Sequence, residues 1–193
     1  KGIMLTHLNY YANSTDAMQY FDVQAGDRLL IILPLDHSFA HTVGIYASAV
    51  KGLSIFFVDA RGGNHNIVRN FPDNLREVNP HFLLTVPTIT GNFMQKMKEG
   101  VYAKGKLISQ LFEAGLAAGI AQYGDGFSSG KELPWHKKLI YNIADKLIFS
   151  KLRSVFGNSI RFCVGGGALL HLSQQQFFAA IGVPVYQGYG LTE

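Results

Sequence analysis

The chain has 193 residues, of which 48% are hydrophobic and 16% charged, and it contains 21 glycines. This composition excludes a disordered, collagen-like or coiled-coil protein, and the length suits one α/β domain with a substantial core. The single cysteine, Cys163, cannot form an internal disulfide, and there is neither a signal peptide nor an apolar run of about 18 residues. These features predict a cytoplasmic globular protein without a membrane-spanning helix.

The net charge of +4 is distributed unevenly along the chain. Residues 96–161 carry 11 Lys and Arg against 5 Asp and Glu, whereas the remainder carries 6 against 8. Residues 162–193 hold one formal charge, Glu193, in a stretch rich in glycine and apolar side chains. That stretch is typical of buried strands and loops lined by backbone. Charge alone leaves three explanations for the basic middle: a solvated face, a surface for acidic lipid headgroups, or a site for a polyanionic ligand.

Short aliphatic or β-branched runs alternate with longer helical patterns. The runs predict five strands, at residues 28–33, 54–58, 82–86, 160–164 and 184–187. The helical patterns predict five helices, at residues 9–21, 41–50, 67–78, 88–98 and 173–181, with Gly26, Gly52 and Gly182 as stop signals after three of them. Such alternation implies right-handed crossovers. We therefore predict one α/β subdomain over residues 1–193, with a mostly parallel sheet covered by helices on both faces.

Residues from about 100 to 157 depart from this alternation and predict a helical insertion. Its first helix has an apolar stripe made of Leu107, Ile108, Leu111, Phe112, Leu116, Ile120 and Tyr123. The second helix, which Pro134 could begin at its first position, has a stripe made of Leu139, Ile140, Ile143, Leu147 and Ile148, accompanied by Lys137, Lys138, Lys146 and Lys151. We expect both stripes to pack and the lysines to be solvated, because a domain of this size needs the core. The alternative is that one face is partly open and rests peripherally on anionic lipid.

Two glycine-rich loops follow the last two predicted strands. The first loop, residues 165–168, reads GGGA, and the second, residues 188–193, reads GYGLTE. In a parallel sheet both loops emerge at the carboxyl edge, where α/β proteins bind ligands. The glycines let a planar group approach the backbone, and Tyr189 offers an aromatic face. Thr192 adds a hydroxyl for phosphate, and Glu193 adds a carboxylate for a hard cation such as Mg²⁺.

Glycine clusters by themselves also suit a tight turn, with Tyr189 capping the core. The ordered combination of GGGALL, a helix and VPVYQGYGLTE is more specific, and it resembles the adenylate-forming superfamily, in particular the acyl-CoA synthetases. Their loops read approximately GGAPL and QGYGxTE, and the second pattern is matched at Gln187, Gly188, Tyr189, Gly190, Thr192 and Glu193. Residues 1–9 (KGIMLTHLN) resemble the segment that follows the family's phosphate loop, and residues 33–39 (LPLDHSF) resemble its acyl-pocket motif. The insertion resembles that of the long-chain fatty acid branch, so the resemblance covers essentially the whole chain.

The resemblance implies part of the large N-terminal domain of a fatty acid–CoA ligase that uses ATP, Mg²⁺ and coenzyme A. In that reaction a fatty carboxylate attacks the α-phosphate of ATP to give acyl-AMP and pyrophosphate, and the thiol of coenzyme A then displaces AMP. By position in the motifs, Thr192, Glu193 and His37 are the candidate catalytic residues, with Glu193 on Mg²⁺, Thr192 on phosphate and His37 at the acyl entrance. The implied nucleotide pocket consists of Gly166, Gly167, Ala168, Gly188, Tyr189, Gly190 and Thr192, with Tyr189 stacked on adenine.

Several alternatives stay open. The chain could belong to another acyl adenylate-forming enzyme, such as an acyl-AMP ligase or an adenylation domain, or to a non-catalytic nucleotide or acyl binding module. We expect no nucleic acid partner, because the lysines of the insertion lack an interleaved aromatic platform. We also expect no dyad of Asp36 and His37, because alternation along a strand would point them in opposite directions. The chain opens at Lys1 and closes at Glu193 like a piece of a larger enzyme, so we expect it to be inactive alone.

Overall fold

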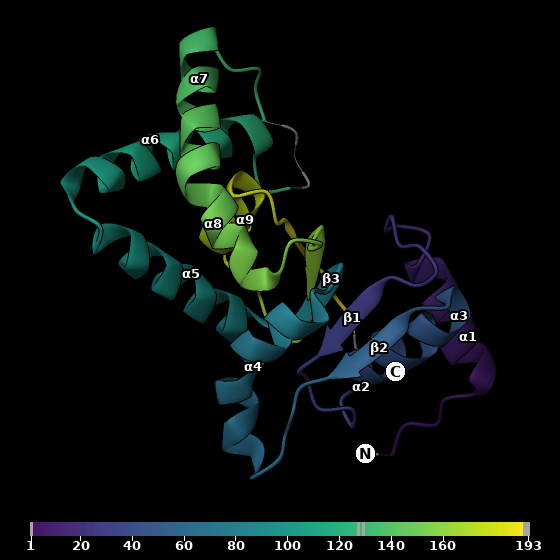
Figure 1. The fold of residues 1–193 in the computed structure, drawn as a ribbon. Helices are drawn as coiled ribbons and strands as arrows, with labels where there is room; N and C mark the ends of the chain where they lie inside the picture. Colours follow the sequence, from purple (N-terminus) through teal and green to yellow (C-terminus); the bar gives the residue numbers. More distant parts are fainter. Residues whose placement is uncertain (1, 127, 129, 191–193) are drawn as a thin grey trace.

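The computed structural model describes residues 2–126, 128 and 130–190, and it contains one five-stranded parallel sheet (Figure 1). The strands are β1 (Arg28–Ile31), β2 (Ser54–Phe57), β3 (Phe82–Thr85), β4 (Phe162–Gly165) and β5 (Val185–Gln187). They are arranged in the order β2-β1-β3-β4-β5, and every neighbouring pair is parallel. The predicted parallel α/β sheet is thus confirmed, and each strand lies within two residues of its predicted position.

Twelve helical segments accompany the sheet in the described part of the chain. They are α1 (His7–Ala17), α2 (Ser38–His41), the π-helical η1 (Thr42–Ala47), α3 (Ser48–Lys51), α4 (Asn64–Val78), α5 (Pro87–Tyr102), α6 (Lys106–Tyr123), α7 (Trp135–Ala144), the π-helical η2 (Asp145–Phe149), α8 (Ser150–Arg153), the 3₁₀ segment η3 (Ser154–Phe156) and α9 (Leu172–Ala180).

Several predicted helix boundaries need correction: the second and third predicted helices begin three residues earlier, at Ser38 and Asn64, and the fourth ends four residues later, at Tyr102. The first helix begins two residues before the predicted start, because Thr6 and Asn9 form a capping box, and it ends well before Gly26. Pro134 stands at the cap that precedes α7 and not at its first helical position. Gly52 and Gly182 do follow helix ends, and both have the left-handed backbone that favours glycine.

Alternate side chains of the strands pack into two separate hydrophobic cores, one on each face of the sheet. Leu30, Leu83 and Cys163 face the larger core, which is built with α4 to α9, whereas Phe82 and Phe162 face the smaller one, beside α1 and η1. In Figure 1, α5 to α9 lie to the left of the strands, and α1 and α3 lie to their right. Both faces of the sheet are therefore covered, as near-continuous apolar strands require, except at the edge strand β2, where Phe56 and Phe57 are exposed.

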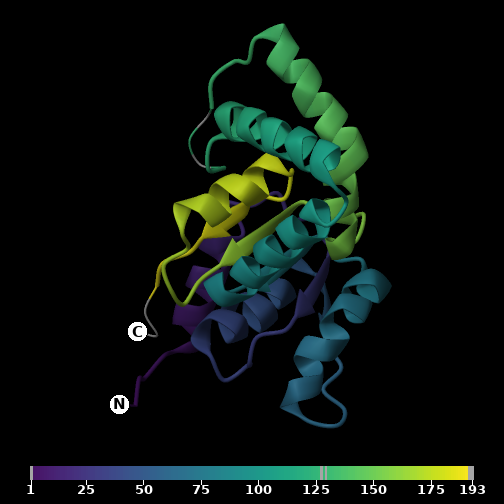
Figure 2. The same cartoon turned by 90° about the vertical axis from the view of Figure 1, so that its left-hand side faces the viewer.

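The insertion packs through small residues. Figure 2 shows α7 outermost, α6 beneath it and α9 beneath α6. Gly115 and Gly119 of α6 make this stacking close: a methyl group at Gly115 would collide with the Cβ atom of Ala144, and one at Gly119 would lie 2.9 Å from the ring of Tyr141. The Tyr141 hydroxyl reaches across to donate a hydrogen bond to the Ala180 carbonyl at 3.0 Å. No helix in the described residues is both long and apolar enough to cross a bilayer.

The predicted packing face of the second insertion helix is right at Ile148, which is buried, and wrong at three of its other four positions. The residues that α7 and η2 bury are Tyr141, Ala144, Ile148 and Phe149, whereas Leu139, Ile143 and Leu147 of the predicted stripe are exposed. The helix is apolar on both sides, and the close approach to Gly115 selects the side that carries Ala144. In the first stripe, Phe112 and Leu116 are buried as predicted, while Leu107 and Tyr123 are exposed.

We expect Gly115→Ala to destabilise the chain by up to about 2 kcal/mol. Alanine improves helix propensity by about 1 kcal/mol, but overpacking against Ala144 costs about 1–3 kcal/mol. Gly100→Ala in α5 is the matched control, because no atom lies within 4 Å of the added methyl group, and it should stabilise by about 0.5–1 kcal/mol. Urea denaturation measures both, and equal gains in the two variants would contradict the packing argument.

Charged side chains tie the amino ends of three strands together. Asp27 precedes β1, is 7% exposed and pairs with the guanidinium of Arg161, which precedes β4. Nδ1 of His81, just before β3, accepts a hydrogen bond from the Arg28 backbone N–H at 2.9 Å and lies 3.6 Å from Asp27 Oδ1. Burial lowers the pKa of His81 below 6.5, although the Asp27 carboxylate opposes the shift. His81 is therefore held neutral, with its proton on Nε2.

This cluster predicts a loss of stability in mild acid. Below pH 6.5 the unfolded chain protonates His81 while the folded chain does not yet, so the unfolded state binds more protons and the free energy of unfolding falls. His81→Gln can keep an acceptor for the Arg28 N–H without titrating. Between pH 7.5 and 5, the wild type should lose stability faster than His81→Gln in urea denaturation, and parallel curves would show that His81 carries no linkage.

Candidate functional site

A cavity opens where the strand order reverses. The chain passes from β1 to β2 on one side of β1 and returns to place β3 on the other, which is the point where open α/β sheets bind ligands. The cavity has a volume of about 280 Å³. It is lined by Leu33, Pro34, Asp36, His37, Phe39, Val86 and Gly166. The loop after β1 and the first glycine loop thus share one cavity.

The two glycine loops lie side by side. The Gly188 N–H donates to the Gly165 carbonyl at 2.7 Å, which continues the β4–β5 ladder beyond the strands. A methyl group at Gly166 would lie 3.6 Å from the Phe39 ring and 3.7 Å from the Gly188 carbonyl oxygen. Gly167 has a φ of +81°, in the region that disfavours a side chain. The site therefore has a wall of backbone, which a flat group can approach closely.

Glutamine side chains hold the first loop in place. The backbone N–H of the buried Leu170 donates to Gln187 Oε1 at 3.1 Å, and the Leu170 carbonyl accepts from Gln175 Nε2 at 3.0 Å. One residue earlier, the buried Gln174 accepts a hydrogen bond from the Thr90 hydroxyl at 2.8 Å. The two bonds at Leu170 connect the end of the loop to β5 and α9, and the third joins α9 to α5. Gln174, Gln175 and Thr90 are not among the predicted site residues. A run of three glutamines that opens an otherwise apolar helix is the sequence signal for the first two, and Thr90 has none.

The other predicted site residues are placed as follows. Tyr189 is 90% exposed on the second loop, so its ring is free to stack. His37 lines the cavity and also caps α2, because its Nδ1 accepts from the Phe39 N–H at 3.3 Å. Thr192 and Glu193 lie outside the described residues, and their roles stay predictions.

The strand alternation from which opposite directions of Asp36 and His37 were expected does not apply to these two residues. Both side chains belong to residues that line the same cavity. The physical reason is that β1 ends at Ile31, so the two residues stand in a turn to which strand alternation does not apply.

The described part of the site supplies binding groups and no activated nucleophile. Burial raises the pKa of the Cys163 thiol to about 12, so this side chain stays neutral inside the larger core. Within residues 2–126, 128 and 130–190, no three His, Cys, Asp or Glu side chains stand close enough to share a metal ion. Backbone amides, an exposed aromatic ring and an apolar cavity remain, and this set suits the binding of a nucleotide beside an apolar group.

We expect Gln175→Met to destabilise the chain by about 1 kcal/mol, because it removes the donor to the Leu170 carbonyl. The same change at the neighbouring Gln176, for which the described residues show no side-chain hydrogen bond, should stay within about 0.5 kcal/mol. Amide exchange in residues 166–170 should also accelerate in the first variant alone. Equal exchange rates in both variants would exclude the anchoring role.

The comparisons with known proteins define the class. A family model described as AMP-binding enzyme matches residues 1–193, and the chain therefore belongs to the AMP-binding enzyme family. Long chain acyl-CoA synthetase 8 of Arabidopsis thaliana is 28% identical over 200 residues, which cover 100% of this chain and 26% of that protein. Long-chain-fatty-acid–[acyl-carrier-protein] ligase AEE15, chloroplastic, also of Arabidopsis thaliana, is 26% identical over 100% of this chain and 28% of its own length. The chain thus spans about a quarter of the length of these curated relatives.

The fold is shared with a solved structure. The N-terminal domain of FACL13 from Mycobacterium tuberculosis superposes with a TM-score of 0.57 at 20% identity, over 100% of this chain and 34% of that one. At this identity the likeness speaks for the fold alone.

Proposed function

We propose that the parent protein is a long-chain fatty acid–CoA ligase that activates its substrate as acyl-AMP. The observation that carries this proposal is the cavity at the strand reversal, which joins the acyl-pocket motif of residues 33–39 to the first glycine loop. A carboxylate is a poor electrophile, and adenylation gives it a good leaving group. The protein's task is then to position the two substrates and to stabilise phosphate charge.

The proposed roles follow the motifs. The ring of Tyr189 stacks on adenine, a contact worth about 1–3 kcal/mol, and its exposure supports this role. The backbone of the two glycine loops forms the floor, with contributions from Gly166, Gly167, Ala168, Gly188 and Gly190. His37 stands near the reacting carboxylate at the cavity wall. Thr192 contacts phosphate, and Glu193 holds Mg²⁺, which when bound supplies positive charge beside the phosphates.

The proposal also covers the cellular location of the protein and the molecule that accepts the acyl group. We place the protein in the cytoplasm, peripheral to a membrane, because long acyl chains partition into bilayers. Coenzyme A is the proposed acceptor. The second candidate is an acyl carrier protein, because the relative AEE15 is named as a ligase for that acceptor. Supplying each acceptor to the full-length protein after acyl-AMP has formed distinguishes the two.

The key experiment is ATP–pyrophosphate exchange with a long-chain fatty acid in the full-length protein. Glu193→Ala should slow exchange by about 10²-fold or more, because it removes the charge that opposes Mg²⁺ at the phosphates. His37→Ala should have a smaller effect, and His37→Asn, which can still cap α2, separates the capping role from the cavity role. We expect the 193-residue chain alone to show no exchange. Small, equal effects of Glu193→Ala and His37→Ala would overturn the assignment by motif.

A further inference from the structure

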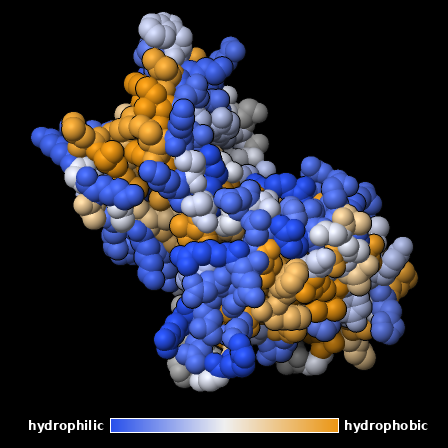
Figure 3. Space-filling model, viewed as in Figure 1, coloured by the Kyte–Doolittle hydropathy of each residue, from blue (hydrophilic) through white to orange (hydrophobic). Residues whose placement is uncertain are grey.

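An apolar stripe runs along the outer side of α7 and η2. Four residues spaced by four, Trp135, Leu139, Ile143 and Leu147, are 78%, 52%, 42% and 49% exposed. The opposite side of the same helix packs on Gly115 of α6, so the chain's own layers do not cover the stripe. Figure 3 shows hydrophobic side chains gathered over α7 and the adjoining part of α6.

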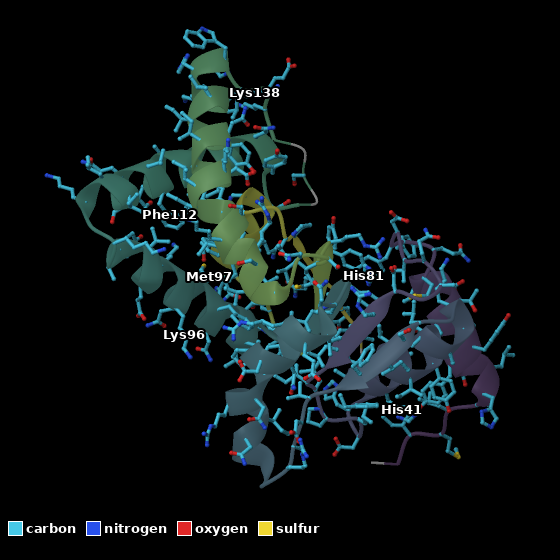
Figure 4. The ribbon with its side chains drawn as sticks, in the orientation of Figure 1. His41, His81, Lys96, Met97, Phe112 and Lys138 are labelled. Atoms are coloured by element: carbon cyan, nitrogen blue, oxygen red, sulfur yellow. The ribbon has the colours of Figure 1, made fainter. Side chains whose placement is uncertain are left out.

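Lysines flank the stripe without acidic partners. Lys138 and Lys146 immediately precede Leu139 and Leu147, and Figure 4 shows Lys138 projecting from α7. Lys137 and Lys151 are also exposed on the same continuous helical stretch, residues 135–153. The one acidic residue of this stretch, Asp145, pairs with Arg153. No described carboxylate forms an ion pair with any of these lysines, so their charge is available to an external anion.

We propose that this outer side of α7 rests on a bilayer containing anionic phospholipid, with the stripe in the headgroup region and the lysines against the phosphates. The pattern is that of an interfacial helix: an apolar side, lysines along it, and an aromatic ring whose polar N–H stays near water. The charge complementarity favours an acidic lipid surface over an apolar protein groove, which would leave the lysines without counter-charges.

The contact would let the protein collect fatty acid directly from the bilayer. That consequence rests on the proposed function, whereas the lipid contact itself does not. It also replaces the expectation that the insertion lysines are only a solvated surface beside fully packed stripes, because three residues of the second stripe are left open.

Trp135 is the chain's single tryptophan, so its fluorescence reports on the stripe directly. The experiment mixes the 193-residue chain with phosphatidylcholine vesicles that contain or lack phosphatidylserine, and follows Trp135 emission and co-sedimentation. We expect a blue shift and co-sedimentation with the phosphatidylserine vesicles, both weakened by high salt. Lys138→Glu with Lys146→Glu should reduce the vesicle-bound fraction by about tenfold. Leu139→Ser with Leu147→Ser should remove the blue shift.

Arg69→Glu with Lys96→Glu is the matched control, since it makes the same charge change on exposed positions of α4 and α5 (Figure 4 labels Lys96). This control pair should leave vesicle binding unchanged. If it lowers the bound fraction as much as the Lys138→Glu, Lys146→Glu variant does, net charge alone explains the effect and the proposal is overturned. Absence of binding to either vesicle, or equal binding to vesicles with and without phosphatidylserine, would also overturn it.

The co-sedimentation is repeated with the full-length protein, where a segment covering the stripe would abolish binding and overturn the proposal. Pyrophosphate exchange with detergent-dispersed fatty acid should be unaffected by the lysine variants, which separates this test from that of the proposed function.

Discussion

The parallel pairing of β4 with both β3 and β5 is the constraint on which the candidate site depends. Gly165 is paired with Thr85 on one side and with Gln187 on the other, so three strands end at one level. The loops that follow start side by side, and the Gly188 N–H bond to the Gly165 carbonyl extends the ladder into them. A slip of one residue would exchange the faces of every side chain in β4 and move Gly166 away from Phe39.

The helical insertion is attached to this sheet without entering it. Residues 106–156 lie between β3 and β4 in the chain, yet these strands pair directly. The insertion can stack as an outer layer because Gly115 and Gly119 let α6 approach α7 and α9 closely. Layering of this kind leaves the outermost helix with one free side, and the sequence fills that side with leucine, isoleucine and lysine instead of a purely polar surface.

The strands were predictable because buried parallel strands are continuous apolar runs, such as residues 29–31 and 82–84, bounded by turn signals. The positions of the glycine loops followed from the strands. The orientation of α7 could not be predicted in the same way, since its periodicity allows two apolar sides and a contact with Gly115, distant in sequence, decides between them. Gln174 was missed for a related reason: its hydrogen bond with Thr90 joins residues 84 positions apart in the sequence and exists only in the folded chain.

The two halves of the site differ in what forms them: the glycine loops present mainly backbone, and the cavity wall presents mainly side chains. The glycine loops are fixed by backbone and amide hydrogen bonds, such as those at Gly188 and Leu170, which are independent of the size of nearby side chains. The cavity wall after β1 and β3 instead consists mostly of side chains, with Leu33, Phe39 and Val86 setting its shape. In the proposed ligase, the nucleotide would therefore be held by the part of the site that tolerates little change in backbone, because Gly167 needs its left-handed φ. The apolar cavity wall would set the selectivity among acyl chains, because exchanging one side chain there changes the volume of the cavity without disturbing the sheet.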